Sequence, residues 1–168
     1  MALISTLEGE FVLRSGQISH RYFDKYRFEG DPALLRRLAK AMSTLLPTET
    51  EIVAGLELGG VPIATAISLE TGLPAAFVRK EAKTYGTCRA IEAQDIAGRK
   101  VTFIEDIIST GGAVADAHAL ADAEGADILG VVCAIWRGDT SRLRQQQRYT
   151  IYPQPTLQKS RPSSQRET

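Results

Sequence analysis

Residues 101–112 read VTFIEDIISTGG, and the interpretation of the whole chain starts from this stretch. An apolar run ends at two adjacent carboxylates, Glu105 and Asp106, and then passes into small hydroxyl and glycine residues. The apolar run predicts a buried strand, and residues 112–125, GAVADAHALADAEG, predict an alanine-rich helix that ends at a glycine. A strand that leads directly into a helix is the repeating unit of an α/β sheet.

The same alternation of strands and helices begins at residue 31. Asp31 and Pro32 are a typical helix start, and leucines then recur at helical spacing until Pro47. The remaining expected elements are strands at 51–55, 74–80, 100–106 and 126–136 and a helix at 61–72 that ends on glycine. The sequence therefore predicts an α/β fold with a doubly wound, mainly parallel sheet flanked by helices.

The two ends of the chain differ from this core. Before residue 31, FVLRS and SHRYFDK lie on either side of a short glycine-containing loop, which predicts a small N-terminal hairpin hood. Near the other end, YTIY (149–152) predicts an edge strand, and the proline-rich polar residues after it predict a disordered tail. We therefore expect one domain over 1–152, made of a hood (1–30) and an α/β core (31–152), followed by a tail (153–168).

Composition excludes several classes of protein. The 168 residues include 20 lysines and arginines and 20 aspartates and glutamates, so no overall charge attracts nucleic acid or an anionic membrane. No apolar stretch approaches the ~20 residues that cross a bilayer, and the N-terminus does not resemble an export signal. Cys88 and Cys133 have neither metal-ligand spacing nor the density of a disulfide scaffold. We expect a soluble cytoplasmic protein.

Three of the predicted strands end in unusual residues, and ligands of such sheets bind beyond the carboxyl ends of the strands. Residues 55–60, GLELGG, allow close backbone approach and lead into a helix N-terminus, which suits a phosphate or pyrophosphate. Residues 79–87, RKEAKTYGT, carry three cations in five residues, which could neutralise a polyanionic leaving group. Taken alone, a glycine-rich turn and a solvated charged loop are the simpler interpretations of these two segments.

The third strand end is the opening stretch. Adjacent carboxylates repel each other, so Glu105 and Asp106 need a divalent cation or hydroxyl donors. Residues 109–112, STGG, offer hydroxyl groups and open backbone N–H groups at a helix start, which is a cradle for a phosphate. A sugar phosphate would satisfy both halves of the segment, whereas the alternative is a capped turn with exposed acidic residues.

This order of residue types resembles the phosphoribosyl pyrophosphate signature of type I phosphoribosyltransferases. Other segments resemble the orotate phosphoribosyltransferases within that family, from about Phe11 to about Gly138. FVLRSGQISHRYFD resembles the family's N-terminal element, and GLELGGVPIATA resembles its pyrophosphate loop. FVRKEAKTYG resembles the family's mobile-loop motif, and VVCAIWRGD resembles its base-binding strand end.

The resemblance implies transfer of a phosphoribosyl group from phosphoribosyl pyrophosphate to orotate, with Mg²⁺ as cofactor. It also implies a homodimer in which each subunit's loop 80–87 reaches the neighbouring site. The residues expected to bind phosphoribosyl pyrophosphate are Gly59, Gly60, Arg79, Lys80, Lys83, Tyr85, Glu105, Asp106, Ile107, Ile108, Ser109, Thr110, Gly111, Gly112 and Ala113.

By the same resemblance, Lys83, Glu105 and Asp106 are the expected catalytic residues. The two carboxylates would also hold magnesium, partly through substrate and water. Orotate would meet Arg14, Ser109 and Arg137, and a planar guanidinium suits the carboxylate of orotate.

Three positions depart from the family pattern: Arg14 replaces a lysine, Tyr85 a histidine and Trp136 an aspartate. Two alternatives to the orotate reaction therefore stay open. The first is a phosphoribosyltransferase for another nucleobase-like acceptor. The second is a regulator that binds phosphoribosyl pyrophosphate without catalysis, which would be expected to carry a DNA-binding domain or a basic face.

Overall fold

A six-stranded sheet forms the centre of the protein. The structure, a computed structural model, describes residues 6–12, 16, 18–24, 26–81, 89–137 and 150–153. The strand order is β5-β4-β3-β6-β7-β8, with only β5 antiparallel to its neighbour. The strands are β3 (Ile52–Leu56), β4 (Ala75–Val78), β5 (Ile91–Ala93), β6 (Lys100–Ile108), β7 (Asp127–Trp136) and β8 (Thr150–Pro153).

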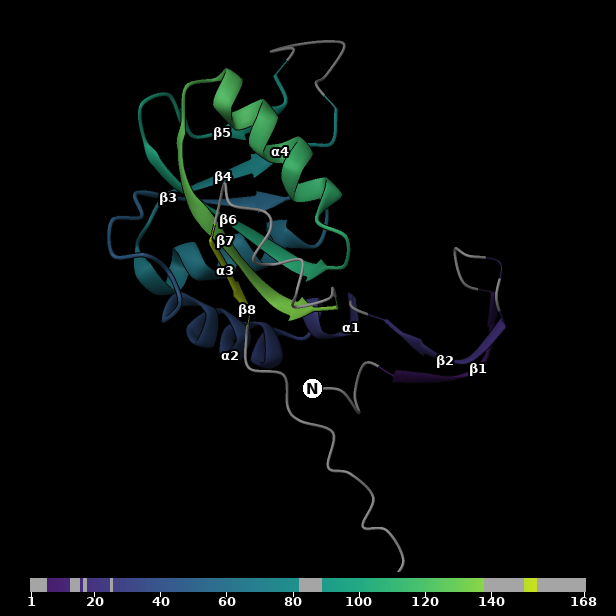
Figure 1. The fold of residues 1–168 in the computed structure, drawn as a ribbon. Coiled ribbons are helices and arrows are strands. Elements are labelled where there is room, and N and C mark those ends of the chain that lie inside the picture. The colour runs from purple at the N-terminus through teal and green to yellow at the C-terminus, as the bar shows by residue number, and fades with distance from the viewer. Residues whose placement is uncertain are drawn as a thin grey trace, which may run out of the picture.

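Helices cover both faces of this sheet (Figure 1). Helices α2 (Pro32–Ser43) and α3 (Gly60–Thr71) pack together on one face, and α4 (Gly112–Ala123) packs on the other. The predicted doubly wound, mainly parallel fold is therefore confirmed.

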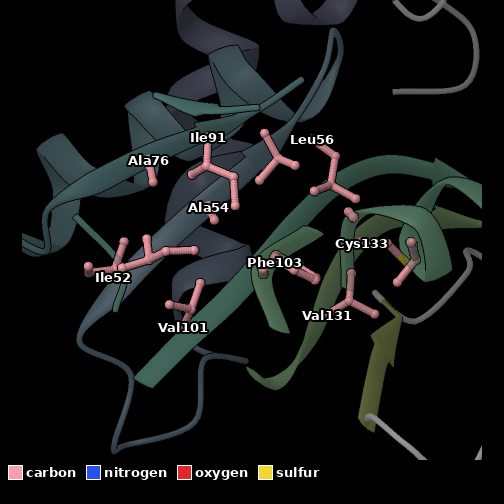
Figure 2. Packing of buried hydrophobic residues seen from close by; sticks show 14 of the residues in the cluster. Ile52, Ala54, Leu56, Ala76, Ile91, Val101, Phe103, Val131 and Cys133 are labelled. Atoms are coloured by element: carbon pink, nitrogen blue, oxygen red, sulfur yellow. The ribbon is translucent and has the colours of Figure 1, made fainter. Parts of the chain in front are cut away.

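The core is divided into two apolar clusters by the sheet. Side chains alternate along a strand, so in β3 Ile52 and Ala54 lie in the cluster under α4, whereas Val53 lies in the cluster under α2 and α3. All five residues of β3 are buried. Figure 2 shows the first cluster, in which Phe103 of β6 packs between residues of β3 and β7. Burial on both faces explains why these strands are continuous apolar runs in the sequence.

Helix ends follow local chemistry closely. Asp31 caps α2, because its Oδ1 accepts hydrogen bonds from the N–H groups of Ala33 (2.9 Å) and Leu34 (3.0 Å). The expected run of this helix to Pro47 is wrong, since α2 ends at Ser43 and the next leucines lie in a turn. Gly72 ends α3 as predicted, in the left-handed conformation at φ 78°.

The N-terminal hairpin is confirmed as β1 (Thr6–Val12) paired with β2 (Ile18–Phe23). It extends from the body of the protein beside α1 (Tyr26–Glu29), a single helical turn that the sequence did not predict (Figure 1). Strand β5 was also not predicted, because three residues carry too little periodicity. The predicted edge strand is β8, whereas residues 154–168 lie outside the described part of the chain.

Strand β6 differs from the prediction in a way that matters for function. It continues to Ile108, two residues beyond the expected end at residue 106, so Glu105 and Asp106 lie within the strand. Among the described residues, no helix is long and apolar enough to cross a membrane.

Candidate active site

Four parallel strands end at the same edge of the sheet, and each is followed by a predicted site segment (Figure 1). These segments are 57–60 after β3, 79–81 after β4, 109–113 after β6 and Arg137 after β7. Hydrogen bonds tie the segments to neighbouring strands: the Glu57 N–H donates to the Val78 carbonyl (2.9 Å) and the Arg137 N–H to the Ile108 carbonyl (2.8 Å). The parallel sheet therefore gathers segments that are far apart in the sequence at one edge.

The glycines of the first segment are required by close packing. A Cβ atom on Gly60 would overlap the carbonyl oxygen of Ile104, and one on Gly55 would lie 2.6 Å from the Gly60 carbonyl oxygen. A Cβ on Gly59 would overlap the carboxyl group of Asp106. The segment also contains a cis peptide bond between Glu57 and Leu58. Residues 57–60 therefore lie directly against β6, at the level of its acidic pair.

The two carboxylates of β6 are both buried, Glu105 with 7% and Asp106 with 2% of its surface exposed. Each carboxylate accepts a hydrogen bond from the next residue in the chain. Glu105 Oε1 accepts from the Asp106 N–H (2.9 Å), and Asp106 Oδ1 accepts from the Ile107 N–H (2.6 Å). These bonds fix the direction of both side chains at the end of the strand.

A cavity of about 380 Å³ lies between Glu105 and the start of α4. Its wall is Glu105, Ile107, Ile108, Ser109, Thr110, Gly111, Gly112, Ala113 and Val114. Gly111 adopts φ 81° before the helix, and the first turn has no capping bond from a side chain. The N–H groups of that turn have no acceptor within the helix, so they can bind an anion such as a phosphate. Because the sequence predicts that a sugar phosphate binds these residues, we refer to this space as the sugar-phosphate cavity.

A second cavity, of about 560 Å³, adjoins the first at Gly112 and Ala113. Arg79 and Lys80 line it together with Glu57, so the cations after β4 and the first residue after β3 face one space, whereas Gly59 and Gly60 line neither cavity. The Nε atom of Arg79 is buried and has no hydrogen-bond partner within the described residues. An anionic ligand in this cavity would supply one, which suits the pyrophosphate end of a substrate.

The structure thus brings most of the predicted site residues together and leaves others apart. Arg137 is exposed at the end of β7 and lines neither cavity. Arg14, Lys83 and Tyr85 lie outside the described residues, so their predicted roles stay predictions.

Glu57, Glu81 and Asp116 line the larger cavity although they were not predicted as site residues. Glu57 lies two residues after the predicted strand 51–55, within the segment GLELGG, and that position could have identified it.

Trp136, one of the departures from the family pattern, packs against the apolar core in this structure. It is partly buried against the apolar cluster beneath α4 and lines neither cavity. Its indole Nε1 is buried and has no hydrogen-bond partner among the described residues.

Cys133 lies opposite Glu105 in the register of β6 and β7 and is fully buried. Burial and, to a smaller extent, the negative charge of Glu105 raise the pKa of its thiol to about 12. The thiolate is the reactive form of cysteine, so this thiol is expected to be inert in the folded protein.

We predict that a Cys88→Ser variant, which keeps Cys133, will not react with a thiol reagent at pH 8 until it is unfolded with denaturant. The stability conferred by the protonated thiol is complete below pH 9, the ordinary pKa of a cysteine side chain, and is lost as pH rises toward 12. Absorbance of the released reagent measures the reaction. Rapid labelling of the native variant would contradict the burial of Cys133.

Comparisons with known proteins agree with this arrangement. A family model described as the phosphoribosyl transferase domain matches residues 29–158. An orotate phosphoribosyltransferase from a Nocardioides species is 58% identical over 134 residues, which is 80% of this chain and 75% of that protein.

Solved structures of orotate phosphoribosyltransferase from Mycobacterium tuberculosis are also similar. The complex with Fe(III) dicitrate has a TM-score of 0.76 at 30% identity, covering 90% of each chain. The complex with 5-phospho-α-D-ribosyl 1-diphosphate has a TM-score of 0.71 at 25% identity, covering 85% of this chain and 84% of that one.

Proposed function

This chain belongs to the phosphoribosyl transferase domain family, among the orotate phosphoribosyltransferases, and from that membership we infer its reaction. It is a pentosyltransferase of pyrimidine biosynthesis that transfers the phosphoribosyl group of phosphoribosyl pyrophosphate to orotate, giving orotidine monophosphate and pyrophosphate. The observation on the molecule that carries the proposal is the sugar-phosphate cavity between Glu105 and the start of α4, with Arg79 and Lys80 around the adjoining cavity.

The geometry suits a substrate that is held at both ends. The 5-phosphate would bind the N–H groups of residues 109–113, and the ribose hydroxyls would donate to the carboxylate of Glu105. Pyrophosphate would occupy the second cavity, where Arg79 and Lys80 would neutralise its charge. The bond from the anomeric carbon to the pyrophosphate oxygen breaks, and a ring nitrogen of orotate forms the new bond at that carbon.

Most of the rate enhancement would come from positioning and from stabilising the leaving group. The sugar is expected to become cation-like as pyrophosphate departs, so a buried carboxylate beside the ribose favours that state. Orotate is already an anion, and its ring nitrogen needs little help from a general base. Exclusion of water from the site would prevent hydrolysis of the activated sugar.

We propose magnesium as the cofactor, and the donors present fit that ion. Glu105 and Asp106 offer hard carboxylate oxygens, which magnesium prefers. Among the described residues, no group of three or more histidine, cysteine, aspartate or glutamate side chains could hold a metal alone. Magnesium usually uses one or two carboxylates and completes its shell with substrate phosphates and water, and it would supply charge neutralisation of the pyrophosphate.

The function is tested by following orotate absorbance on addition of phosphoribosyl pyrophosphate, with magnesium and after chelation. Loss of absorbance only with magnesium is expected. Turnover of another base but not of orotate would favour the alternative acceptor. Binding of phosphoribosyl pyrophosphate without turnover of any base would favour a non-catalytic regulator.

Lys83 provides a first test of the leaving-group role. Replacement by alanine is expected to lower turnover about 10- to 100-fold, because it removes one charged donor to pyrophosphate. Circular dichroism should show an unchanged fold. Lys40, exposed on α2, provides the control, and Lys40→Ala should keep full activity. Unchanged turnover in Lys83→Ala would remove this lysine from the catalytic scheme.

Arg137 provides a test of base recognition. We expect Arg137→Ala to raise the KM for orotate about tenfold or more, because an ion pair with the orotate carboxylate is lost. The KM for phosphoribosyl pyrophosphate should change far less. Steady-state kinetics with each substrate varied in turn measures both values, and equal losses for the two substrates would argue against a carboxylate contact.

We also propose that the protein is a cytoplasmic homodimer in which loop 80–87 reaches the partner's site. An uncharged segment at 58–69 supports this, because Leu58 and Leu69 are 61% and 84% exposed on the surface around α3. Light scattering would measure the molar mass of the protein in solution and so distinguish a dimer from a monomer. If the loop is shared, mixing the impaired Lys83→Ala and Glu105→Gln variants should raise turnover above that of either variant alone, since one mixed site is intact. No restoration in a proven mixed dimer would place each loop in its own site.

A further inference from the structure

The wall of the second cavity has two chemically different parts. Its volume of about 560 Å³ lies within the range of ~300–1,000 Å³ that is typical of small-molecule sites. Arg79 and Lys80 form the cationic part of the wall. Four other residues form an uncharged part that we call the apolar floor: Leu56, Val78, Ala117 and Leu120. Pyrophosphate has no apolar group, so it would use only the cationic part.

Two residues of the apolar floor are the ends of neighbouring strands. Leu56 is the last residue of β3 and Val78 the last of β4, and the two are partners in the parallel register. Their side chains therefore lie side by side on one face of the sheet. Both residues are 3% exposed and belong to the apolar cluster beneath α4. This half of the floor is held in place by the core of the protein.

Helix α4 supplies the other half of the apolar floor. Ala113, Asp116, Ala117 and Leu120 line the cavity at the spacing i, i+3, i+4 and i+7, which places them on one face of the helix. Two of these four residues are alanines, whose methyl groups leave space that a longer side chain would fill. Ala117 is 5% exposed and Leu120 is partly buried against the cluster beneath α4. The space beside this face is therefore bounded by core residues.

The cationic part of the wall adjoins the apolar floor directly, because Arg79 follows Val78 in the chain. The Arg79 N–H donates to the Ala90 carbonyl at 2.8 Å, and the Val78 carbonyl accepts the Glu57 N–H at 2.9 Å. The side-chain Nε of Arg79 is buried and has no hydrogen-bond partner within the described part of the chain. A buried guanidinium donor without an acceptor indicates an anionic ligand, which would lie next to the floor.

The charge of the wall makes apolar contacts important for affinity. Besides the two cations, three carboxylates line the cavity, those of Glu57, Glu81 and Asp116. They repel a polyanion and offset part of its attraction to Arg79 and Lys80. Burial of an apolar group is independent of this repulsion and is worth about fourfold in affinity for each CH₂ removed from water. A ligand that covers the floor would therefore bind more tightly than pyrophosphate.

We propose that the second cavity is a subsite for diphosphate-like anions that carry a short alkyl group. The two phosphoryl groups lie at Arg79 and Lys80, and the alkyl group lies on the apolar floor. This inference rests on the proposed function, because it extends the position assigned to pyrophosphate. Such a ligand has no ribose to transfer, so it competes with phosphoribosyl pyrophosphate and inhibits the reaction.

The experiment is titration calorimetry of the full chain in magnesium-containing buffer with two probes that differ by one butyl group. These probes are methanebisphosphonate and pentane-1,1-bisphosphonate. The butyl-bearing probe should bind at least about tenfold more tightly, and pyrophosphate should displace both probes. Equal affinity of the two probes would overturn the proposal. Binding of the butyl-bearing probe that pyrophosphate cannot displace would also overturn it, since the ligand would then lie elsewhere.

Leu120 provides the test of where the alkyl group lies. Leu120→Asn should reduce the advantage of the butyl-bearing probe at least about fivefold and leave the affinity for methanebisphosphonate within about twofold, because both cations remain. Leu35→Asn is the matched control, since Leu35 is a partly buried leucine of α2 that lines neither cavity. It should leave both affinities within about twofold. An undiminished advantage in Leu120→Asn would overturn the proposal.

Two further measurements use the unaltered protein and so do not depend on the folding of a variant. The heat-capacity change on binding should be more negative for the butyl-bearing probe, because apolar surface is buried, and equal values for the two probes would overturn the proposal. Turnover of orotate tests the proposed function separately. A protein that prefers the butyl-bearing probe but does not turn over orotate would keep the subsite and lose the assigned reaction.

Discussion

Replacing Glu105 by glutamine is expected to lower turnover by about 10²- to 10³-fold, which is the range for loss of one preorganised charge at a reacting centre. Glutamine has nearly the same shape and can still accept the N–H of Asp106, a hydrogen bond that measures 2.9 Å with the carboxylate. The change therefore removes the negative charge at the sugar-phosphate cavity with little effect on the local structure.

Glu70→Gln is the matched control for this prediction. Glu70 is an exposed glutamate near the far end of α3 and lines neither cavity, so the same chemical change there should leave turnover within about twofold. Turnover is measured from orotate absorbance at saturating substrates. Equal turnover in Glu105→Gln and the unaltered protein would show that the charge of Glu105 is not needed and would remove it from the mechanism.

Gly60→Ala is expected to lower the free energy of unfolding by about 3 kcal/mol, the upper end of the range for overpacking. The added methyl group would collide with the carbonyl oxygen of Ile104 and approach the backbone of Gly55. Both neighbours belong to the central strands of the sheet, so neither can move without disturbing the ladder between β3 and β6. Backbone atoms relax less easily than the end of a flexible side chain.

Gly112→Ala tests whether this effect is specific. Gly112 and Gly60 each begin a helix, α4 and α3 respectively. A Cβ on Gly112 would lie no closer than 3.8 Å to Thr110 Oγ1, so the substitution should change the free energy of unfolding by less than about 0.5 kcal/mol. Urea unfolding of both variants measures the difference. Similar losses in the two variants would show that the collision at Gly60 is not the cause.

The sequence predicted the fold well because its signals are local or depend on burial. Asp31 and Pro32 specify a helix start through one side chain and one ring, whatever the rest of the chain does. The continuous apolar runs of β6 and β7 indicate strands covered on both faces, and that pattern alone favours a parallel sheet. The three-residue strand β5 was missed because it forms by pairing with β4. The sequence of these three residues does not show which strand they pair with.

The candidate site likewise combines features that the sequence predicted with features that depend on strand pairing. The order of residue types in VTFIEDIISTGG indicated a sugar phosphate, and the structure places Glu105 and residues 109–113 around one cavity. The sequence treated Glu105 and Asp106 as one acidic pair, since adjacency is all that a sequence displays. Their separate surroundings follow from the alternation of side chains along β6. Asp106 meets Gly59 only because β3 and β6 are neighbours in the sheet.

By itself, the sequence determined the class of fold, the segments that bear charge and the family of the protein, because propensity, burial pattern and motif are carried by consecutive residues. Only the tertiary structure decided which of those segments face one another. The contact between Gly59 and Asp106, the packing of Trp136 against the core and the cavity that Arg79 shares with α4 all depend on strand order and register. Strand order and register arise from packing between residues that are distant in the chain, so no single segment encodes them.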